Sequence, residues 1–193
     1  MTDLSTYLQM TTVIDADHPA VTALAARLAE GLKSPAETAA ACFAWVRDEI
    51  SHTGDVGQGP VPCRASDVLA ARTGFCYAKS HLLAALLRAN GIPAGLCYQR
   101  LSIDGVGAPF CLHGMVAVHL PDIGWYRCDP RGDKPGIATR FTPPTESLAY
   151  APALPGECDI PGIHPAPLPQ VAEALTRHAT CAALADDLPD AAP

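Results

Sequence analysis

The feature that most constrains the fold is residues 73–95, which read TGFCYAKSHLLAALLRANGIPAG. Behind Cys76, leucines recur at helical spacing, and the segment closes at Asn90-Gly91 with Pro93 just beyond. Glycine after the last periodic residue and proline soon afterwards are helix stop signals. The segment therefore predicts a buried helix that carries a thiol on its first turn.

The elements on either side of this helix differ in kind. Start signals with proline in the first turn predict earlier helices that begin near residues 19 and 35. Alternating apolar residues predict strands after it. Helices followed by strands with hairpin-length links favour an α+β fold with an antiparallel sheet. The predicted strands are 94–101, 111–120 and 125–129, with a further short one at 11–14.

The chain has 193 residues, enough to bury a core as a single domain spanning 1–193. Residues 141–170 hold eight prolines and are expected to wrap the surface as extended coil. A last helix is expected over roughly 168–186, where apolar residues again share one face.

Charge and cysteine content narrow the class of protein. The net charge of −7 argues against a nucleic-acid partner, and no apolar run is long enough to span a membrane. The N-terminus lacks the basic and apolar regions of a secretory signal, so a cytoplasmic location with eight reduced cysteines is expected. Four disulfides are the alternative.

Cys76 is the candidate nucleophile. The first N–H groups of a helix lack intrahelical partners, and the helix dipole is positive there, so this position stabilises a thiolate. The same N–H groups can receive the oxyanion of a tetrahedral intermediate. Gly74 lets the chain turn sharply into the helix. A buried structural thiol is the alternative interpretation.

A thiolate nucleophile requires a base and a group that orients the base. His113 lies early in the strand CLHGMVAVHL, and Gly114 beside it leaves room for a helix N-terminus. Asp129 ends the next strand, and a hairpin would bring the two side chains together. His119 is the rival base, near the far end of the same strand.

Other polar residues carry weaker hypotheses. Gln58 is a candidate oxyanion donor in a Gly/Pro loop, whereas His52 and His81 are more simply solvated or hydrogen-bonded. Lys79 and Arg88 are expected to be solvated helix residues. A metal site from Cys111, His113 and Cys128 does not match a common ligand spacing, and no metal or organic cofactor is expected.

Three quoted segments resemble one family. TGFCYAKSHLLAALLRANGIPAG resembles the cysteine-helix motif of the transglutaminase-like superfamily, and LHGMVAVHLPDIGWYRCDP resembles its His strand and Asp-Pro turn. FAWVRDEISH resembles the helix that precedes this core. The resemblance covers roughly residues 36–135. It implies a papain-like core in which Cys76 is the nucleophile, His113 the base and Asp129 the orienting carboxylate. Where the family usually has a small residue and Trp after the His, this chain has Gly114-Met115, which affects the wall of the substrate cleft.

The resemblance implies a cysteine hydrolase or acyltransferase that attacks amide or peptide bonds and forms a thioester acyl-enzyme. In a peptidase or amidase, water would release the acyl group from the enzyme. In a transglutaminase, an amine would release it. The alternatives are an arylamine N-acetyltransferase-like acyl carrier and a non-catalytic binding module that retains the fold. Specificity depends on cleft loops such as 52–63 and 102–110, so neither the substrate nor the oligomeric state follows from the sequence.

Overall fold

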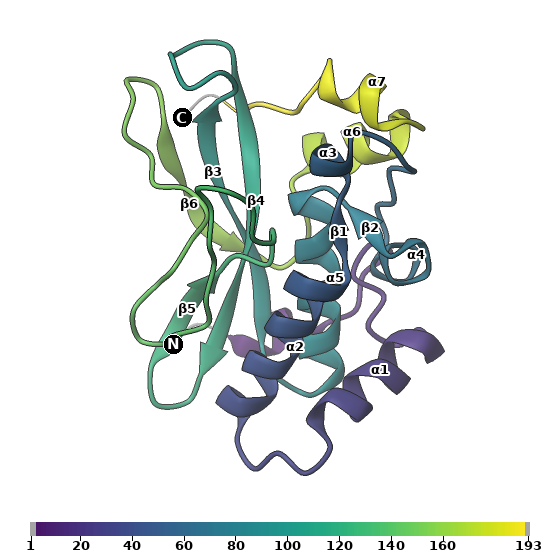
Figure 1. Ribbon diagram of the computed structural model, residues 1–193. Coiled ribbons are helices and arrows are strands. Elements are labelled where there is room, and N and C mark those ends of the chain that lie inside the picture. The colour runs from purple at the N-terminus through teal and green to yellow at the C-terminus, as the bar shows by residue number, and fades with distance from the viewer. Residues whose placement is uncertain (1–2, 192–193) are drawn as a thin grey trace.

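A computed structural model describes residues 3–191 as a layer of helices packed against an antiparallel sheet (Figure 1). The helices are α1 (Pro19–Ala29), α2 (Pro35–Glu49), α3 (Thr53–Val56), α4 (Ala65–Ala71), α5 (Cys76–Ala89), α6 (Pro169–Arg177) and α7 (Cys181–Ala185), preceded by a 3-10 helix at Leu4–Leu8. The strands are β1 (Ser51–His52), β2 (Thr73–Gly74), β3 (Ala94–Ser102), β4 (Phe110–Leu120), β5 (Gly124–Cys128) and β6 (Cys158–His164). This arrangement confirms the α+β fold class.

The helices begin where the sequence signals predict. The Ser34 side chain accepts a hydrogen bond from the Glu37 N–H, and the Glu37 carboxylate accepts one from the Ser34 N–H, so α2 opens with a complete capping box. His18 caps α1 in front of Pro19. These local bonds satisfy N–H groups that would otherwise lack partners at the helix ends.

Helix α5 is the centre of the core. Its residues from Cys76 to Arg88 are all buried, and it contacts α1, α2, α4 and the strands β3 and β4. The larger sheet has the order β5-β4-β3-β6 with antiparallel pairing throughout. Leu112, Val116 and Val118 of β4 join the same core as the helices, whereas Met115 packs on the opposite face of the sheet. The strand alternation predicted from the sequence is therefore confirmed.

The predicted strand at Thr11–Ile14 is wrong, because a turn occupies these residues. The Thr11 N–H donates to the Ile14 carbonyl, and the Ile14 N–H donates to Thr11 Oγ1. These bonds close the segment into a turn, and the Val13 carbonyl accepts from the Ala65 N–H rather than from a neighbouring strand.

The C-terminal third is more regular than expected. Strand β6 lies inside the proline-rich segment and pairs with β3 as the edge strand, where Pro161 is tolerated beside a register shift. The single helix expected over 168–186 is two helices, because α6 ends at Arg177 and Thr180 caps α7 through the Ala183 N–H. Within residues 3–191, no helix combines the length and the apolar character that crossing a membrane requires.

Two basic residues of α5 are buried, contrary to the expectation that they are solvated. Arg88 donates to the carbonyls of Gln9, Ala94 and Pro165, which ties the start of β3 and two segments distant in sequence to the C-terminal end of α5. Lys79 donates to carbonyls at the C-terminal end of α2. Both cations find their partners in backbone oxygens of segments that the sequence places far away.

We expect Arg88→Ala to lower the free energy of unfolding by about 3 kcal/mol, because it leaves buried carbonyl groups without donors. Arg177→Ala is the matched control, since Arg177 is half-exposed and its ion pairs contribute at most about 1 kcal/mol. Urea denaturation of both variants measures the difference. Equal losses would show that the Arg88 bonds do not hold the three segments.

Candidate active site

Three elements bring Cys76, His113 and Asp129 together. Cys76 is the first residue of α5, directly after its N-cap Phe75. His113 lies in β4, and Asp129 follows the last residue of β5. The antiparallel register pairs Val116 with Cys128, which places the end of β5 beside the middle of β4. The core thus positions all three side chains on ordered elements rather than on long loops.

The carboxylate of Asp129 is fully buried and has partners for both oxygens. Oδ2 lies 2.7 Å from His113 Nε2 and accepts a hydrogen bond of 3.0 Å from the Ala149 N–H. Oδ1 accepts one of 3.0 Å from the Arg131 N–H. Burial opposes ionisation of this carboxyl group, but the charge of His113 and these hydrogen bonds keep its pKa below the ordinary value.

The backbone of β4 approaches the nucleophile at Gly114. Its N–H donates to Cys76 Sγ over 3.5 Å. A Cβ at this position would lie 3.0 Å from the ring of Tyr77 and 3.1 Å from its Cα, which is too close for a packed core. Glycine beside His113 is therefore what allows the first turn of α5 to reach the strand.

His113 is held as a cation. Burial lowers the pKa of His113, but the charges of Asp129 and Cys76 and hydrogen bonds to both outweigh it and raise the pKa to about 10. Because Asp129 occupies Nε2, Nδ1 is the ring nitrogen left for the thiol. A thiol beside an imidazolium at a helix N-terminus is the environment of reactive cysteines.

Cys76 and His113 line a cleft of about 580 Å³. Its walls are largely apolar, and they include Phe75, Leu101, Ile103, Leu112 and Leu188. The ring of Tyr150 also lines it and meets His113 edge-on, with ring centroids 4.9 Å apart. Cys76 is 7% exposed, so the nucleophile candidate lies at a largely buried position in the wall of this cleft.

A second layer of polar residues surrounds Asp129. The Arg131 guanidinium donates to both oxygens of Asp55 over 2.6 and 2.7 Å, and its Nε donates to the hydroxyl of Tyr150 over 3.0 Å. The sequence reasoning missed these residues. Arg131 follows Asp129 by two positions on one turn, which is a usable signal, but nothing in the sequence connects Asp55 or Tyr150 to the site.

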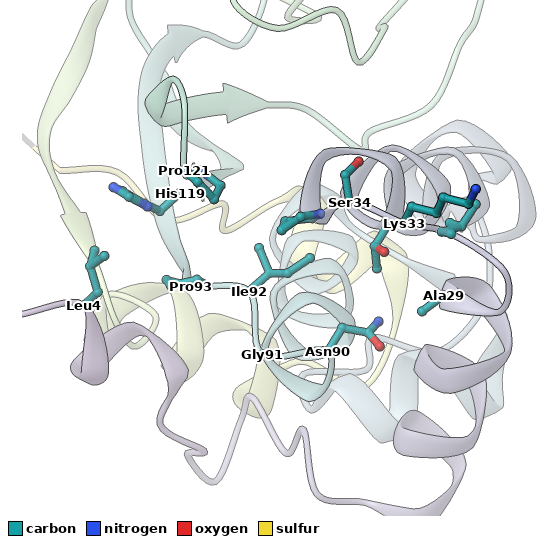
Figure 2. Close-up of a pocket in the computed structure, with 13 residues that line it drawn as sticks. Leu4, Ala29, Lys33, Ser34, Asn90, Gly91, Ile92, Pro93, His119 and Pro121 are labelled. Atoms are coloured by element: carbon teal, nitrogen blue, oxygen red, sulfur yellow. The ribbon is translucent and has the colours of Figure 1, made fainter.

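The rival base His119 lies elsewhere. It lines a second pocket of about 570 Å³, shown in Figure 2, together with Asn90, Gly91 and Pro93. This pocket is at the C-terminal end of α5, which is about 20 Å long, whereas Cys76 is at the other end. His119 instead meets Trp125 edge-on, with centroids 5.3 Å apart. It therefore cannot act as a base on Cys76.

Of the remaining candidates, Gln58, His81 and Cys128 do not line the cleft that contains Cys76. Gln58 is exposed and does not line the cleft, so the prediction of an oxyanion donor there is not supported. His81 is buried and bonds the Cys63 carbonyl at 2.8 Å. Cys128 packs in the helix-facing core, whereas Cys111 lines the cleft, and residues 3–191 contain no cluster of His, Cys, Asp and Glu arranged to hold a metal ion. All eight cysteines are free thiols.

Comparison with known proteins identifies a family. The model of the transglutaminase-like superfamily matches residues 22–130, which include Cys76, His113 and Asp129. No curated protein matches the chain.

Two solved structures illustrate the likeness. A candidate cysteine protease from Cytophaga hutchinsonii is 20% identical, with a TM-score of 0.55 over 68% of this chain and 43% of that one. The periplasmic domain of TgpA from Pseudomonas aeruginosa is 26% identical, with a TM-score of 0.48 over 66% of this chain and 47% of that one. The likeness to the Cytophaga hutchinsonii structure supports the fold described above. The chain spans less than half the length of either structure.

We expect Asp129→Asn to lower the pKa of His113 by about 1–3 units, because it removes the charge that opposes burial. In the folded wild-type protein, the pKa of His113 lies above the ordinary 6.5. The contribution of the His113–Asp129 pair to the free energy of unfolding is therefore complete below pH 6.5 and is lost as pH rises toward 10. NMR titration of the His113 Cε1 signal from pH 5 to 11 measures the shift.

The matched control is Asp187→Asn, which removes a half-exposed carboxylate from His178 at the surface and leaves His113 untouched. A wild-type His113 that titrates near 6.5 would contradict the imidazolium assignment.

Proposed function

Because the chain belongs to the transglutaminase-like superfamily, we propose that it is a cysteine-dependent hydrolase or acyl transferase acting on amide or peptide bonds. The single observation that carries this proposal is the constellation of a helix N-terminal thiol and a histidine cation in one cleft, with a buried carboxylate bonded to the histidine. A nucleophile, a base and an orienting group in hydrogen-bonded order are what thiol acyl transfer requires.

In the proposed mechanism, Cys76 attacks the acyl carbon as a thiolate, forming a C–S bond while the carbonyl electrons move to oxygen. His113 gives its Nδ1 proton to the departing amine, and the C–N bond breaks to leave a thioester on Cys76. Asp129 keeps the ring oriented through Nε2 and stabilises the imidazolium. The neutral His113 then takes a proton from water or an amine as its oxygen or nitrogen attacks the thioester carbon. The C–S bond breaks, the acyl group leaves as an acid or a new amide, and Cys76 is again a thiolate beside the His113 imidazolium.

The walls of the cleft favour an acyl group without charge. Of the two charged side chains among its described lining residues besides His113, Arg131 is paired with Asp55, and Glu157 accepts from the N–H groups of Ser102, Ala153 and Leu154. These groups are therefore committed to the fold. An uncharged peptide or amide acyl group fits the apolar lining formed by Phe75 and its neighbours best.

The alternative of a non-catalytic binding module requires His113 to be engaged away from Cys76. Instead, the pair lines one cleft, and the charge of Cys76 contributes to the raised pKa of His113. A non-catalytic binding module would not need a buried carboxylate such as Asp129 hydrogen-bonded to Nε2 of His113. These contacts favour an enzyme.

We expect iodoacetamide near pH 7 to alkylate Cys76 selectively, giving one adduct per chain by intact mass and peptide mapping, and Cys76→Ala to abolish amide turnover. Cys111 is the internal control, because it lines the same cleft but burial raises its pKa to about 12. Adducts spread evenly over the eight cysteines, or full turnover by Cys76→Ala, would refute the proposal.

The reaction type can be separated with the same protein. A panel of p-nitrophenyl esters and peptide p-nitroanilides identifies the acyl group, and an added primary amine competes with water for the acyl-enzyme in a transglutaminase but not in a hydrolase. Incubation with acetyl-CoA followed by intact mass tests the acyl-carrier alternative, which alone would gain a stable acetyl group on Cys76.

A further inference from the structure

A tetrahedral oxyanion at Cys76 needs more than the helix N-terminus to receive it. Thiol acyl transferases commonly combine a backbone N–H at the nucleophile with a side-chain donor. Among the described residues that line the cleft, none carries a side-chain amide or an indole. The donors nearby are mostly occupied, since the Tyr77 hydroxyl donates to the Leu112 carbonyl and the Ser102 hydroxyl to the Gly107 carbonyl.

His52 lies in this cleft and has no role in the triad. Strand β1 pairs in parallel with β2, and the register sets His52 opposite Gly74, two residues before Cys76. Figure 1 shows these two short strands next to α5. The imidazole also meets the ring of Phe75 edge-on, with centroids 5.7 Å apart. His52 is therefore held beside the chain that enters the nucleophile helix.

The ring of His52 is unsatisfied. Its side chain is only 12% exposed, and its Nδ1 is buried without a hydrogen-bond partner, at 3.8 Å from Asp55 Oδ2. Both oxygens of Asp55 already accept from Arg131. Across residues 3–191, no side chain or backbone group forms a hydrogen bond with either ring nitrogen. Because Nδ1 lies beside Asp55, Nε2 is the ring nitrogen left for a ligand in the cleft that His52 lines.

The surroundings also determine the charge of His52. Burial and the positive charge of Arg131 lower its pKa to about 3, and the charge of His113 acts in the same direction, whereas Asp55 opposes them. The ring is therefore neutral at neutral pH and keeps one N–H. A neutral imidazole can polarise a carbonyl by hydrogen bonding without competing with His113 for the proton that the base transfers.

We propose that His52 is a catalytic residue that donates a hydrogen bond from Nε2 to the oxyanion formed when Cys76 attacks its acyl substrate. This inference rests on the proposed function. As the C–S bond forms, the carbonyl electron pair moves to oxygen, which accepts from the His52 Nε2–H and from the Cys76 backbone N–H. When the carbonyl reforms, the pair returns, the bond to the leaving group breaks, and His52 keeps its proton throughout.

Tyr150 is the competing donor. Its hydroxyl accepts from Arg131 Nε, so its own proton is uncommitted, and its ring packs on His113. The Tyr150 ring packs on His113 and can shield its imidazolium. His52 instead lies beside Gly74 and Phe75, the two residues that precede Cys76. The experiment therefore includes Tyr150→Phe.

Two reactions of Cys76 distinguish oxyanion stabilisation from thiol reactivity. Alkylation by iodoacetamide displaces iodide at a saturated carbon and forms no oxyanion, whereas acylation by p-nitrophenyl acetate passes through a tetrahedral oxyanion. His52→Phe keeps an aromatic ring against Phe75 but removes the donor. His52→Gln replaces the imidazole with a side chain that still carries an N–H.

For His52→Phe we expect the alkylation rate at Cys76 to stay within about 2-fold of wild type, while the p-nitrophenolate burst rate falls about 100-fold, the usual loss for one oxyanion donor. The burst rate of His52→Gln should be at least about 10-fold higher than that of His52→Phe, because the glutamine amide can donate to the same oxygen. Tyr150→Phe should lose far less in acylation than His52→Phe.

Three results would overturn the inference: acylation unchanged in His52→Phe, acylation and alkylation falling together, or the larger selective loss in Tyr150→Phe. The unchanged alkylation rate also reports that the variant is folded at the site. Failure of the proposed function looks different, because the wild-type protein would then show no acylation at Cys76 at all, and that result rejects both proposals.

Discussion

The close approach of α5 to β4 at Gly114 is the contact on which the site depends. Without a side chain at this position, the strand backbone reaches the first turn of the helix, and its N–H lies 3.5 Å from the Cys76 sulfur. His113 is the preceding residue, so the same contact brings its imidazole and the Cys76 thiol into one cleft. Because both elements belong to the core, the geometry of the pair is as rigid as the packing around it.

Buried charge is the second constraint. A carboxylate, an imidazolium and a guanidinium lie close together under the cleft, and each would be costly to desolvate alone. Each of these buried charges has hydrogen-bond partners. Asp129 bonds His113 and two backbone N–H groups, and the side chain of Arg131 bonds Asp55. His52, close to this network, lacks such compensation and stays neutral. Beside the paired charges of Asp129, His113 and Arg131, Nδ1 of His52 has no hydrogen-bond partner among the described residues, and the proposed oxyanion role rests partly on that contrast.

The sequence was most informative about elements that depend on interactions between residues close together in the chain. The leucine spacing and stop signals predicted α5, the start signal with proline predicted the beginning of α2, and alternation predicted that β4 is a strand. The three site residues could be named because their motifs resemble a family in order and spacing. Strand β6 was missed because its proline content is typical of coil, and only its partner β3 at the sheet edge makes it a strand. Arg88 was misjudged because two of its three acceptors, the carbonyls of Gln9 and Pro165, are distant in sequence.

By itself, therefore, the sequence determined which segments form helices and strands, and which thiol begins a helix, since caps, periodicity and turn residues act over a few positions. Only the tertiary structure decided which histidine faces that thiol, because His113 and His119 share a strand and differ only in which end of α5 they meet. It likewise decided which side chains enclose the cleft. Contacts between distant segments depend on how the helices pack on the sheet, and no local pattern encodes that packing.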